Sequence, residues 1–418
     1  MGLIKILFKT IGVLLVLFVV GAGGLIASDW LYFKRLLTVD LSNIIMDVEW
    51  YKPLEIVEGD EHPALPRAAP DQVTIEEVAL KKAVAFAESY GSASLLVWHT
   101  GMLQLEWYGE GYGPETLTNS ASMHKSVMAL LYGNIIAEGF IPSVDEWAAT
   151  YLTEWADDDR SKITIRNLLQ MSSGLARPQF SANPLGDALK LALGTNVVSI
   201  ALKYKATDPP NTYFAYSNLN AQLLGIILER ATGERYAEIL ESYLWSKLGT
   251  SDARVWLDSP GGMVRTFSNL QTKPENWLRL GLLHLNRGRV NGTQVVSEDW
   301  IKEVTTPSDT NPNYGFQTWL GTEWEENRGY GKGVPITVRH SEPFAADNIV
   351  FFDGSGGQRV YVVPSHDLVI VRTGPGGTDP VTGNFDWDDA ILPNTIINGI
   401  VPVATSIENA VNETELSE

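Results

Sequence analysis

The chain has 418 residues, of which 44% are hydrophobic and 19% are charged, and its formal net charge at pH 7 is -19. This composition is typical of a globular protein with one or two domains, and the lack of any basic block argues against a nucleic-acid partner. The absence of cysteine excludes disulfides and thiolate chemistry, and the six histidines show no metal-ligand spacing, so we expect neither a metal nor a cofactor.

Residues 1–28 are predicted to form a membrane anchor or a signal segment. No charged residue occurs between residues 10 and 28, and residues 11–20 are almost wholly apolar, which suits a membrane-spanning helix or a long signal peptide. We favour an uncleaved single-pass anchor, because the small-residue pattern of a cleavage site is poor. Lys5 and Lys9 precede the segment, so the positive-inside rule predicts that the rest of the chain is exported to the periplasmic or extracellular side of the cell membrane.

Residues 29–73 mix aromatic, acidic and proline residues without a sustained period, which is typical of a juxtamembrane connector. The folded body is expected to begin after this segment, where Thr74 and Glu77 form a capping-box pattern that opens a helix. Residues 93–100 and 103–108 are separated by a glycine-containing turn, and this arrangement predicts a β-hairpin.

The stretch 119–139 carries the chemistry on which the interpretation depends. A short polar run leads into apolar residues at helical spacing, which places Ser122 at the start of a helix. Lys125 lies three residues later on the same helix face, whereas His124 is turned away from both. A helix N-terminus favours an alkoxide, and a lysine held among apolar neighbours loses proton affinity. The pattern therefore indicates a serine nucleophile beside an amine base.

The rest of the chain changes from helical to strand-like patterns. Residues from about 140 to 260 show repeated helical spacing with little strand alternation, which predicts a mainly helical subdomain. Strands and a final helix are expected closer to the C-terminus, at residues 348–352, 359–363, 368–372 and 390–397. Because strands near both ends flank the helices, we expect one sheet assembled from both parts of the chain. Residues 401–418 are read as an acidic tail.

A second motif, Tyr216-Ser217-Asn218, lies at the end of the run Pro-Pro-Asn-Thr-Tyr-Phe-Ala-Tyr-Ser-Asn at residues 209–218. This run resembles the second motif of the serine β-lactamase and penicillin-recognising superfamily, in the branch related to class C β-lactamases, esterases and nylon-oligomer hydrolases. Further segments resemble blocks of that branch in the same order, at residues 164–175, 261–266, 277–286, 314–319 and 354–358. Together the similar segments extend over roughly residues 75 to 400.

The resemblance implies an α/β (α+β) fold, in which an antiparallel β-sheet flanked by helices lies beside a mainly helical subdomain, within a hydrolase domain at residues 74–400. It also implies that Ser122 is the acylated nucleophile and that Lys125 helps to deprotonate it. By the same similarity, Tyr216 transfers the proton to the leaving group, and Asn218 orients Lys125 and the substrate. The Ser122 N–H is one donor to the oxyanion, and the second is expected from substrate-binding residues on a strand edge, Gly354, Ser355, Gly356 and Gly357.

The same strand departs from the superfamily pattern. β-Lactamases usually carry Lys-Thr-Gly there, whereas this chain has Asp353-Gly354-Ser355-Gly356 and no cation for a substrate carboxylate. Arg359 or His340 could approach in space. We therefore expect a membrane-anchored serine hydrolase that acts on small carboxylic esters or amides. A D-alanyl-D-alanine carboxypeptidase or β-lactamase is the alternative enzyme, and a non-catalytic ligand-binding or sensor module is the alternative of another class.

Overall fold

The computed structural model describes residues 23–24, 26–179, 183–376 and 387–401. Its central element is an antiparallel six-stranded sheet in the order β3-β2-β14-β13-β12-β9. The strands are β2 (Ser94–His99), β3 (Met102–Tyr108), β9 (Trp319–Leu320), β12 (Val350–Gly354), β13 (Gln358–Val363) and β14 (Leu368–Thr373). Pairing of β2 with β14, from Ser94 opposite Thr373 to His99 opposite Leu368, joins the two ends of the chain and confirms the expected shared sheet.

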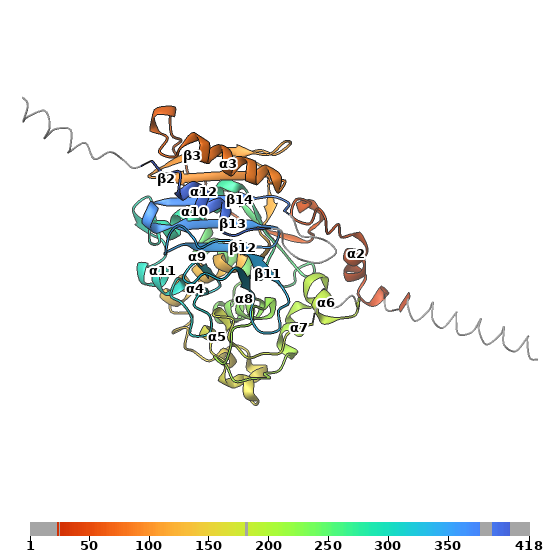
Figure 1. Ribbon diagram of the computed structural model, residues 1–418. Helices are drawn as coiled ribbons and strands as arrows, with labels where there is room; N and C mark the ends of the chain where they lie inside the picture. The colour runs from red at the N-terminus through yellow and green to blue at the C-terminus, as the bar shows by residue number, and fades with distance from the viewer. Residues whose placement is uncertain (1–22, 25, 180–182, 377–386, 402–418) are drawn as a thin grey trace, which may run out of the picture.

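Both faces of this sheet are covered, which explains why its central strands are continuous runs of apolar residues. Helix α10 (Pro274–Leu285) packs on one face, and α3 (Glu77–Ser89) with α12 (Ile391–Ile397) covers the other, as Figure 1 shows. Helix α10 approaches closely at Gly281, where an added Cβ would lie 2.5 Å from a methyl carbon of Val369. The sheet is therefore the middle layer of an α/β/α arrangement.

A mainly helical part lies next to the sheet, below it in the view of Figure 1. It contains α4 (His124–Ala137), α5 (Ile165–Leu169), α6 (Asp187–Leu193), α7 (Val197–Lys203), α8 (Asn218–Thr232) and α9 (Tyr236–Tyr243). Helix α4 is buried along nearly its whole length and contacts α8, α9 and α11 (Glu298–Val304). The helix that carries Lys125 is thus enclosed in the core.

The structure also contains a second, four-stranded sheet in the order β1-β5-β6-β4, which our sequence analysis did not predict. Its strands are β1 (Leu54–Val57), β4 (Thr118–Asn119), β5 (Ala253–Trp256) and β6 (Leu270–Thr272). Two small hairpins complete the strands, formed by β7 (Arg289–Val290) with β8 (Thr293–Gln294) and by β10 (Asn327–Gly329) with β11 (Thr337–Arg339). Strand β4 leads directly into the turn that holds Ser122.

The predicted capping box at Thr74 and Glu77 is wrong, although the helix itself exists. Helix α3 begins at Glu77 after Glu76, which makes no side-chain cap. The Thr74 hydroxyl instead bonds to the ring of His99, and the Thr74 N–H donates to the side chain of Gln104. The tertiary partners on β2 and β3 have replaced the local cap.

Residues 29–73 are folded onto the body, in contrast to our expectation that the body begins after them. Helix α2 (Trp30–Thr38) contacts α6, and β1 pairs with β5. Arg35 of α2 is only 4% exposed. Its guanidinium donates to five backbone carbonyl groups, those of Lys52, Leu193, Gly194, Leu257 and Asp258. This arginine joins the N-terminal segment to the loops beside α6 and β5.

The apolar stretch 11–20 of the predicted anchor and the tail after residue 401 lie outside the described residues. Among the helices of the described part, none has the length and apolar character needed to span a bilayer.

We predict that Arg35→Ala lowers the free energy of unfolding by about 3 kcal/mol, because it removes a donor from five buried carbonyl groups, of which those of Lys52, Gly194 and Leu257 keep another donor. Chemical denaturation with the enzyme at fixed concentration measures the change. Arg287→Ala is the matched control: this arginine is exposed and pairs only with Glu298 at the surface, so the stability should stay within about 0.5 kcal/mol of the wild type. Equal effects of the two variants would contradict the role of Arg35.

Candidate active site

Ser122 lies in a 3₁₀ turn, Ala121–Met123, between β4 and α4. The turn is tightly held: the Ser120 N–H donates to the Leu270 carbonyl, and the Ala121 N–H donates to the Asn119 side chain. Ala121 has φ +44°, a left-handed conformation that a non-glycine residue adopts at an energetic cost and that is common near functional sites. The strained turn presents Ser122, which is half-buried, ahead of a fully buried helix.

Lys125 lies one turn further on and directs its amine at Ser122, as the sequence spacing predicts. Its Nζ atom is 2.8 Å from Ser122 Oγ, 2.9 Å from Asn218 Oδ1 and 2.6 Å from the Phe267 carbonyl oxygen. Burial lowers the pKa of the amine to about 7, and the Asp353 carboxylate partly opposes this shift. A large share of the molecules therefore carries a neutral amine near pH 7.

The three contacts of Lys125 determine what the neutral amine can do. It has two N–H groups and one lone pair, and the oxygen atoms of Asn218 and Phe267 can only accept hydrogen bonds. When these oxygens take the two N–H groups, the lone pair is left for the Ser122 hydroxyl. The geometry thus favours a base that accepts the serine proton.

Tyr216 and Asn218 come from the start of α8 and lie on the other side of Lys125. The Tyr216 ring centroid is 5.0 Å from Lys125 Nζ, and the Ser122 side chain is near enough to the Tyr216 hydroxyl to affect its pKa. Burial raises the pKa of Tyr216, with the Asp353 charge adding to the shift, so the tyrosine is a neutral phenol that can donate a proton. The structure therefore brings together all four residues predicted to carry the chemistry.

The glycine-rich strand end borders the Ser122 turn, but its four predicted residues differ in position. An added Cβ on Gly354 would lie 2.4 Å from the Ser120 carbonyl oxygen, so only glycine permits this approach. Ser355 is exposed at the turn after β12. Gly356 and Gly357 have φ +79° and +71°, and a Cβ on Gly357 would meet the Trp387 ring. Gly354 thus lies against the turn that holds the nucleophile, Ser355 is at the exposed turn that follows, and the other two glycines shape that turn.

Neither cation considered from the sequence is free to bind a substrate carboxylate. Arg359 is 1% exposed and is bonded to Asp353, to Asp389 and to the carbonyl groups of Gly354 and Gln358. His340 is buried with its ring 4.3 Å from that of Phe344, and burial lowers its pKa. Both side chains belong to the core.

Several groups that shape the site escaped sequence analysis. The Phe267 carbonyl could not be identified from the sequence, because every residue has a backbone carbonyl group. Tyr314, Trp319 and Tyr330 surround Tyr216, with ring centroids 6.2, 6.0 and 5.1 Å away. These three residues are far from Tyr216 in the sequence, so local patterns could not predict the grouping. Tyr314 and Trp319 do lie within a segment that resembles the superfamily.

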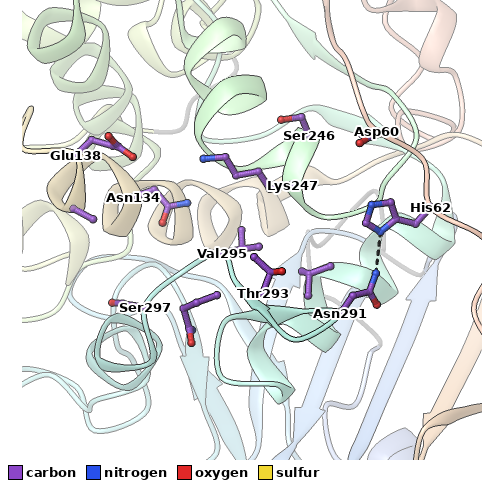
Figure 2. A pocket seen from close by; sticks show the side chains of 13 residues that line it. Asp60, His62, Asn134, Glu138, Ser246, Lys247, Asn291, Thr293, Val295 and Ser297 are labelled. Atoms are coloured by element: carbon purple, nitrogen blue, oxygen red, sulfur yellow. Dashed lines mark hydrogen bonds between the residues drawn. The ribbon is translucent and has the colours of Figure 1, made fainter.

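A surface hollow of about 540 Å³ lies elsewhere and shares no residue with the Ser122 site. Figure 2 shows its polar rim, where the side chains of His62 and Asn291 are joined by a hydrogen bond opposite Asn134 and Glu138. In the described ranges, no group of three or more His, Asp and Glu side chains is arranged to hold a metal ion.

The chain is similar in sequence to a known protein family and to several known proteins. The family model described as Beta-lactamase matches residues 79–388. The 6-aminohexanoate-dimer hydrolase of Paenarthrobacter ureafaciens is 26% identical over 228 residues, which cover 50% of this chain and 56% of that protein. Penicillin-binding protein 4* of Bacillus subtilis (strain 168) is 29% identical over 150 residues, or 34% of this chain and 31% of that protein. The chain thus matches about half or less of the length of these curated relatives.

Solved structures show the same fold at low sequence identity. A Bacillus anthracis protein assigned as a 6-aminohexanoate-dimer hydrolase superposes with a TM-score of 0.65 and 20% identity, covering 90% of this chain and 94% of that one. EstCE1, described as a hydrolase with promiscuous acyltransferase activity, has a TM-score of 0.57 and 14% identity, covering 77% of this chain and 98% of that one.

We predict that a fluorophosphonate labels Ser122 at a rate that rises with pH through a midpoint near 7, because the reaction needs the neutral form of Lys125. Intact-mass measurements at a series of pH values give the rate. Ser122→Ala should give no adduct while retaining the wild-type melting temperature, since the hydroxyl contributes little packing. An adduct on the alanine variant would show that another residue is the nucleophile.

Proposed function

The chain belongs to the beta-lactamase family of serine hydrolases, and from this premise we propose that it cleaves small carboxylic esters or amides through an acyl-enzyme on Ser122. The observation that carries the proposal is the position of the Lys125 amine, which has hydrogen-bond distances to Ser122 Oγ and to two acceptor oxygens. A desolvated amine in this arrangement can take the serine proton at neutral pH.

In the first half of the reaction, Lys125 accepts the proton as Ser122 Oγ attacks the substrate carbonyl carbon. The carbonyl oxygen gains negative charge and is stabilised by the Ser122 N–H together with a backbone donor from the strand end at Gly354 and Ser355. The positive end of the α4 dipole favours the same charge. The tetrahedral intermediate then collapses to the acyl-enzyme.

Departure of the alcohol or amine requires a proton, and the Tyr216 phenol supplies it from its position beside Ser122 and Lys125. Its raised pKa keeps it protonated until the leaving group becomes basic. The protonated Lys125 then returns a proton to the Tyr216 oxygen, and its amine lies 5.0 Å from the centroid of the Tyr216 ring. In the second half, the same pair takes a proton from the water that attacks the acyl carbon. The pair then gives a proton to Ser122 Oγ as the bond between this oxygen and the acyl carbon breaks and the carboxylic acid leaves.

Two features favour neutral acyl substrates over β-lactams. The strand that ends at Gly354 has an aspartate where a cation would bind the substrate carboxylate, and Arg359 is held by Asp353 and Asp389. A relative named 6-aminohexanoate-dimer hydrolase acts, by its name, on a small oligomer. Because one relative is named as a penicillin-binding protein, a carboxypeptidase or β-lactamase function is the second candidate. A pure binding module has no chemical need for the Lys125 geometry.

We further propose that the enzyme is anchored in the cell membrane by residues 1–28, with the hydrolase domain at residues 74–400 on the exported side. The apolar, uncharged stretch near the N-terminus supports the anchor, and the two lysines before it support the orientation. Residues 30–57 pack on the hydrolase domain, so the active site would be held close to the bilayer.

Neutral p-nitrophenyl esters should have a kcat/KM at least about a hundredfold above that of benzylpenicillin, because a charge-assisted hydrogen bond to the carboxylate is missing and is worth about 1.5 to 3 kcal/mol. Ser355→Lys places an amine at the exposed strand end and should narrow the ratio by improving penicillin acylation. Ser365→Lys, on the distant turn between β13 and β14, is the control and should leave the ratio unchanged. Comparable rates for the two wild-type substrates would contradict the proposed preference.

Deletion of residues 1–28 should release the protein from membranes with its esterase activity unchanged. The deletion retains Asp29, whose side chain caps α2 and bonds to Thr195. Deletion of residues 1–57 should instead abolish activity and folding, because it removes Arg35 and strand β1. Fractionation and esterase assays test both variants, and membrane retention of the shorter deletion would show that another surface holds the protein there.

A further inference from the structure

A closed ring of four buried charges lies behind the Ser122 site. Arg328 donates to Asp353 at 3.1 Å and to Asp389 at 2.7 Å, and Arg359 pairs with the same two carboxylates, at 2.8 Å for Asp389. All four side chains are at most 4% exposed. Two positive and two negative groups alternate around the ring, so each buried charge has two opposite partners.

Asp353 connects this ring to the active-site tyrosine. The Tyr330 hydroxyl donates to the Asp353 carboxylate, while the Tyr330 carbonyl accepts the Tyr216 N–H at 3.0 Å. The Tyr330 ring also meets the Tyr216 ring edge-on. One residue thus holds both the backbone and the ring of Tyr216, and its own hydroxyl is fixed by Asp353.

A second route leads through Arg328 and Trp319. The Arg328 guanidinium lies 4.0 Å from the centre of the Trp319 ring, which in turn stacks on Tyr216 with an interplanar angle of 25°. Asp353 accepts a hydrogen bond from the same guanidinium. The two routes reach Tyr216 through different neighbours, so a displacement of the Asp353 carboxylate would change both sets of contacts.

Asp353 also fixes the strand that borders the nucleophile. It directly precedes Gly354, which lies against the Ser120 carbonyl in the turn that carries Ser122. Buried ion pairs add little net stability, because desolvation of the charges offsets their attraction. A contribution to stability alone therefore does not account for a carboxylate at the meeting point of strand β12, Tyr330 and Arg328.

We propose that Asp353 is a positioning residue for the hydrolytic reaction, which holds Tyr216 through Tyr330 and Arg328 and holds the Gly354 strand end beside Ser122. This inference rests on the proposed function of the Ser122 site. It gives a function to Asp353, which stands where related enzymes carry a cation. It also gives a function to Arg359, which pairs with Asp353 and is therefore not free to bind an anionic substrate.

The charge of Asp353 has a separate, measurable effect on Lys125. Burial lowers the pKa of the amine, and Asp353 is the charge that opposes this shift. The other titratable groups at the amine are neutral: burial raises the pKa of Tyr216 and lowers that of His124 to about 4. Arg328 and Arg359 face Asp353 from the far side. Removal of the carboxylate charge should therefore lower the pKa of Lys125 further.

Asp353→Asn tests the proposal, since it keeps the shape and an acceptor oxygen but removes the charge. We expect kcat for a p-nitrophenyl ester to fall about tenfold or more with KM nearly unchanged, because a hydrogen bond to a charged group is weakened. The acidic limb of kcat/KM should move to lower pH by roughly half a unit or more. A wild-type kcat and pH profile in the folded variant would overturn the proposal.

Asp388→Asn is the matched control. Asp388 is also buried, but its carboxylate accepts from the N–H groups of Ser341 and Ala390 and pairs with the exposed Arg339. The variant should lower the melting temperature without moving the acidic limb. If both variants lower stability and neither moves the pH profile, Asp353 has only a structural role.

Tyr330→Phe serves as the second variant in case Asp353→Asn does not fold, because it keeps the ring and removes only the hydroxyl that bonds to Asp353. It should lower kcat about tenfold with little change in melting temperature. An unchanged kcat would overturn the proposal even without a folded asparagine variant. Labelling of wild-type Ser122 by a fluorophosphonate distinguishes a failure of the proposed function from a failure of the proposed role of Asp353. If Ser122 is not labelled, the proposed function is wrong. If Ser122 is labelled but the variants have wild-type kcat and pH profiles, only the role of Asp353 is wrong.

Discussion

The burial of the Lys125 amine among acceptor oxygens is the constraint on which the site depends. A charged amine in the core is costly, and the Phe267 carbonyl, the Asn218 side chain and the Ser122 hydroxyl are its hydrogen-bond partners. These partners come from three separate segments, so the helical part and the small sheet must meet α4 in one arrangement. The enclosed environment of α4 lowers the pKa of the amine, and the same enclosure keeps its direction toward Ser122 fixed.

The four buried charges behind this amine, those of Asp353, Asp389, Arg328 and Arg359, form ion pairs with one another. The aromatic rings of Trp319 and Tyr330 lie between Arg328 or Asp353 and Tyr216. The site therefore offers a nucleophile, a base and a phenol, but neither Arg328 nor Arg359 is free for a ligand. This set of groups suits an uncharged acyl substrate, because backbone N–H donors stabilise its carbonyl oxygen and no cation is needed.

Local patterns predicted the parts of the structure in which sequence neighbours act together. Helical spacing placed Ser122 and Lys125 on one face, and the hairpin and strand patterns gave the long strands of the central sheet. The folded state of residues 30–57 escaped prediction, because α2 and β1 are short and their key contact is a buried arginine that sequence reasoning assigns to the surface. The capping pattern at Thr74 failed because His99 and Gln104 are competing partners from other elements. The ring around Asp353 joins residues up to 61 positions apart, which no local pattern reports.

Direct titration of the Lys125 amine shows whether this lysine is neutral near pH 7 and can act as the base for Ser122. Protein carrying lysine labelled with ¹³C at Cε can be followed by NMR from acidic to basic pH, with Lys125→Arg used to assign the signal. We expect a midpoint near 7 for Lys125, clearly below those of the other lysines. A midpoint close to the ordinary lysine value of about 10.4 would mean that the amine stays charged at neutral pH and cannot be the base for Ser122.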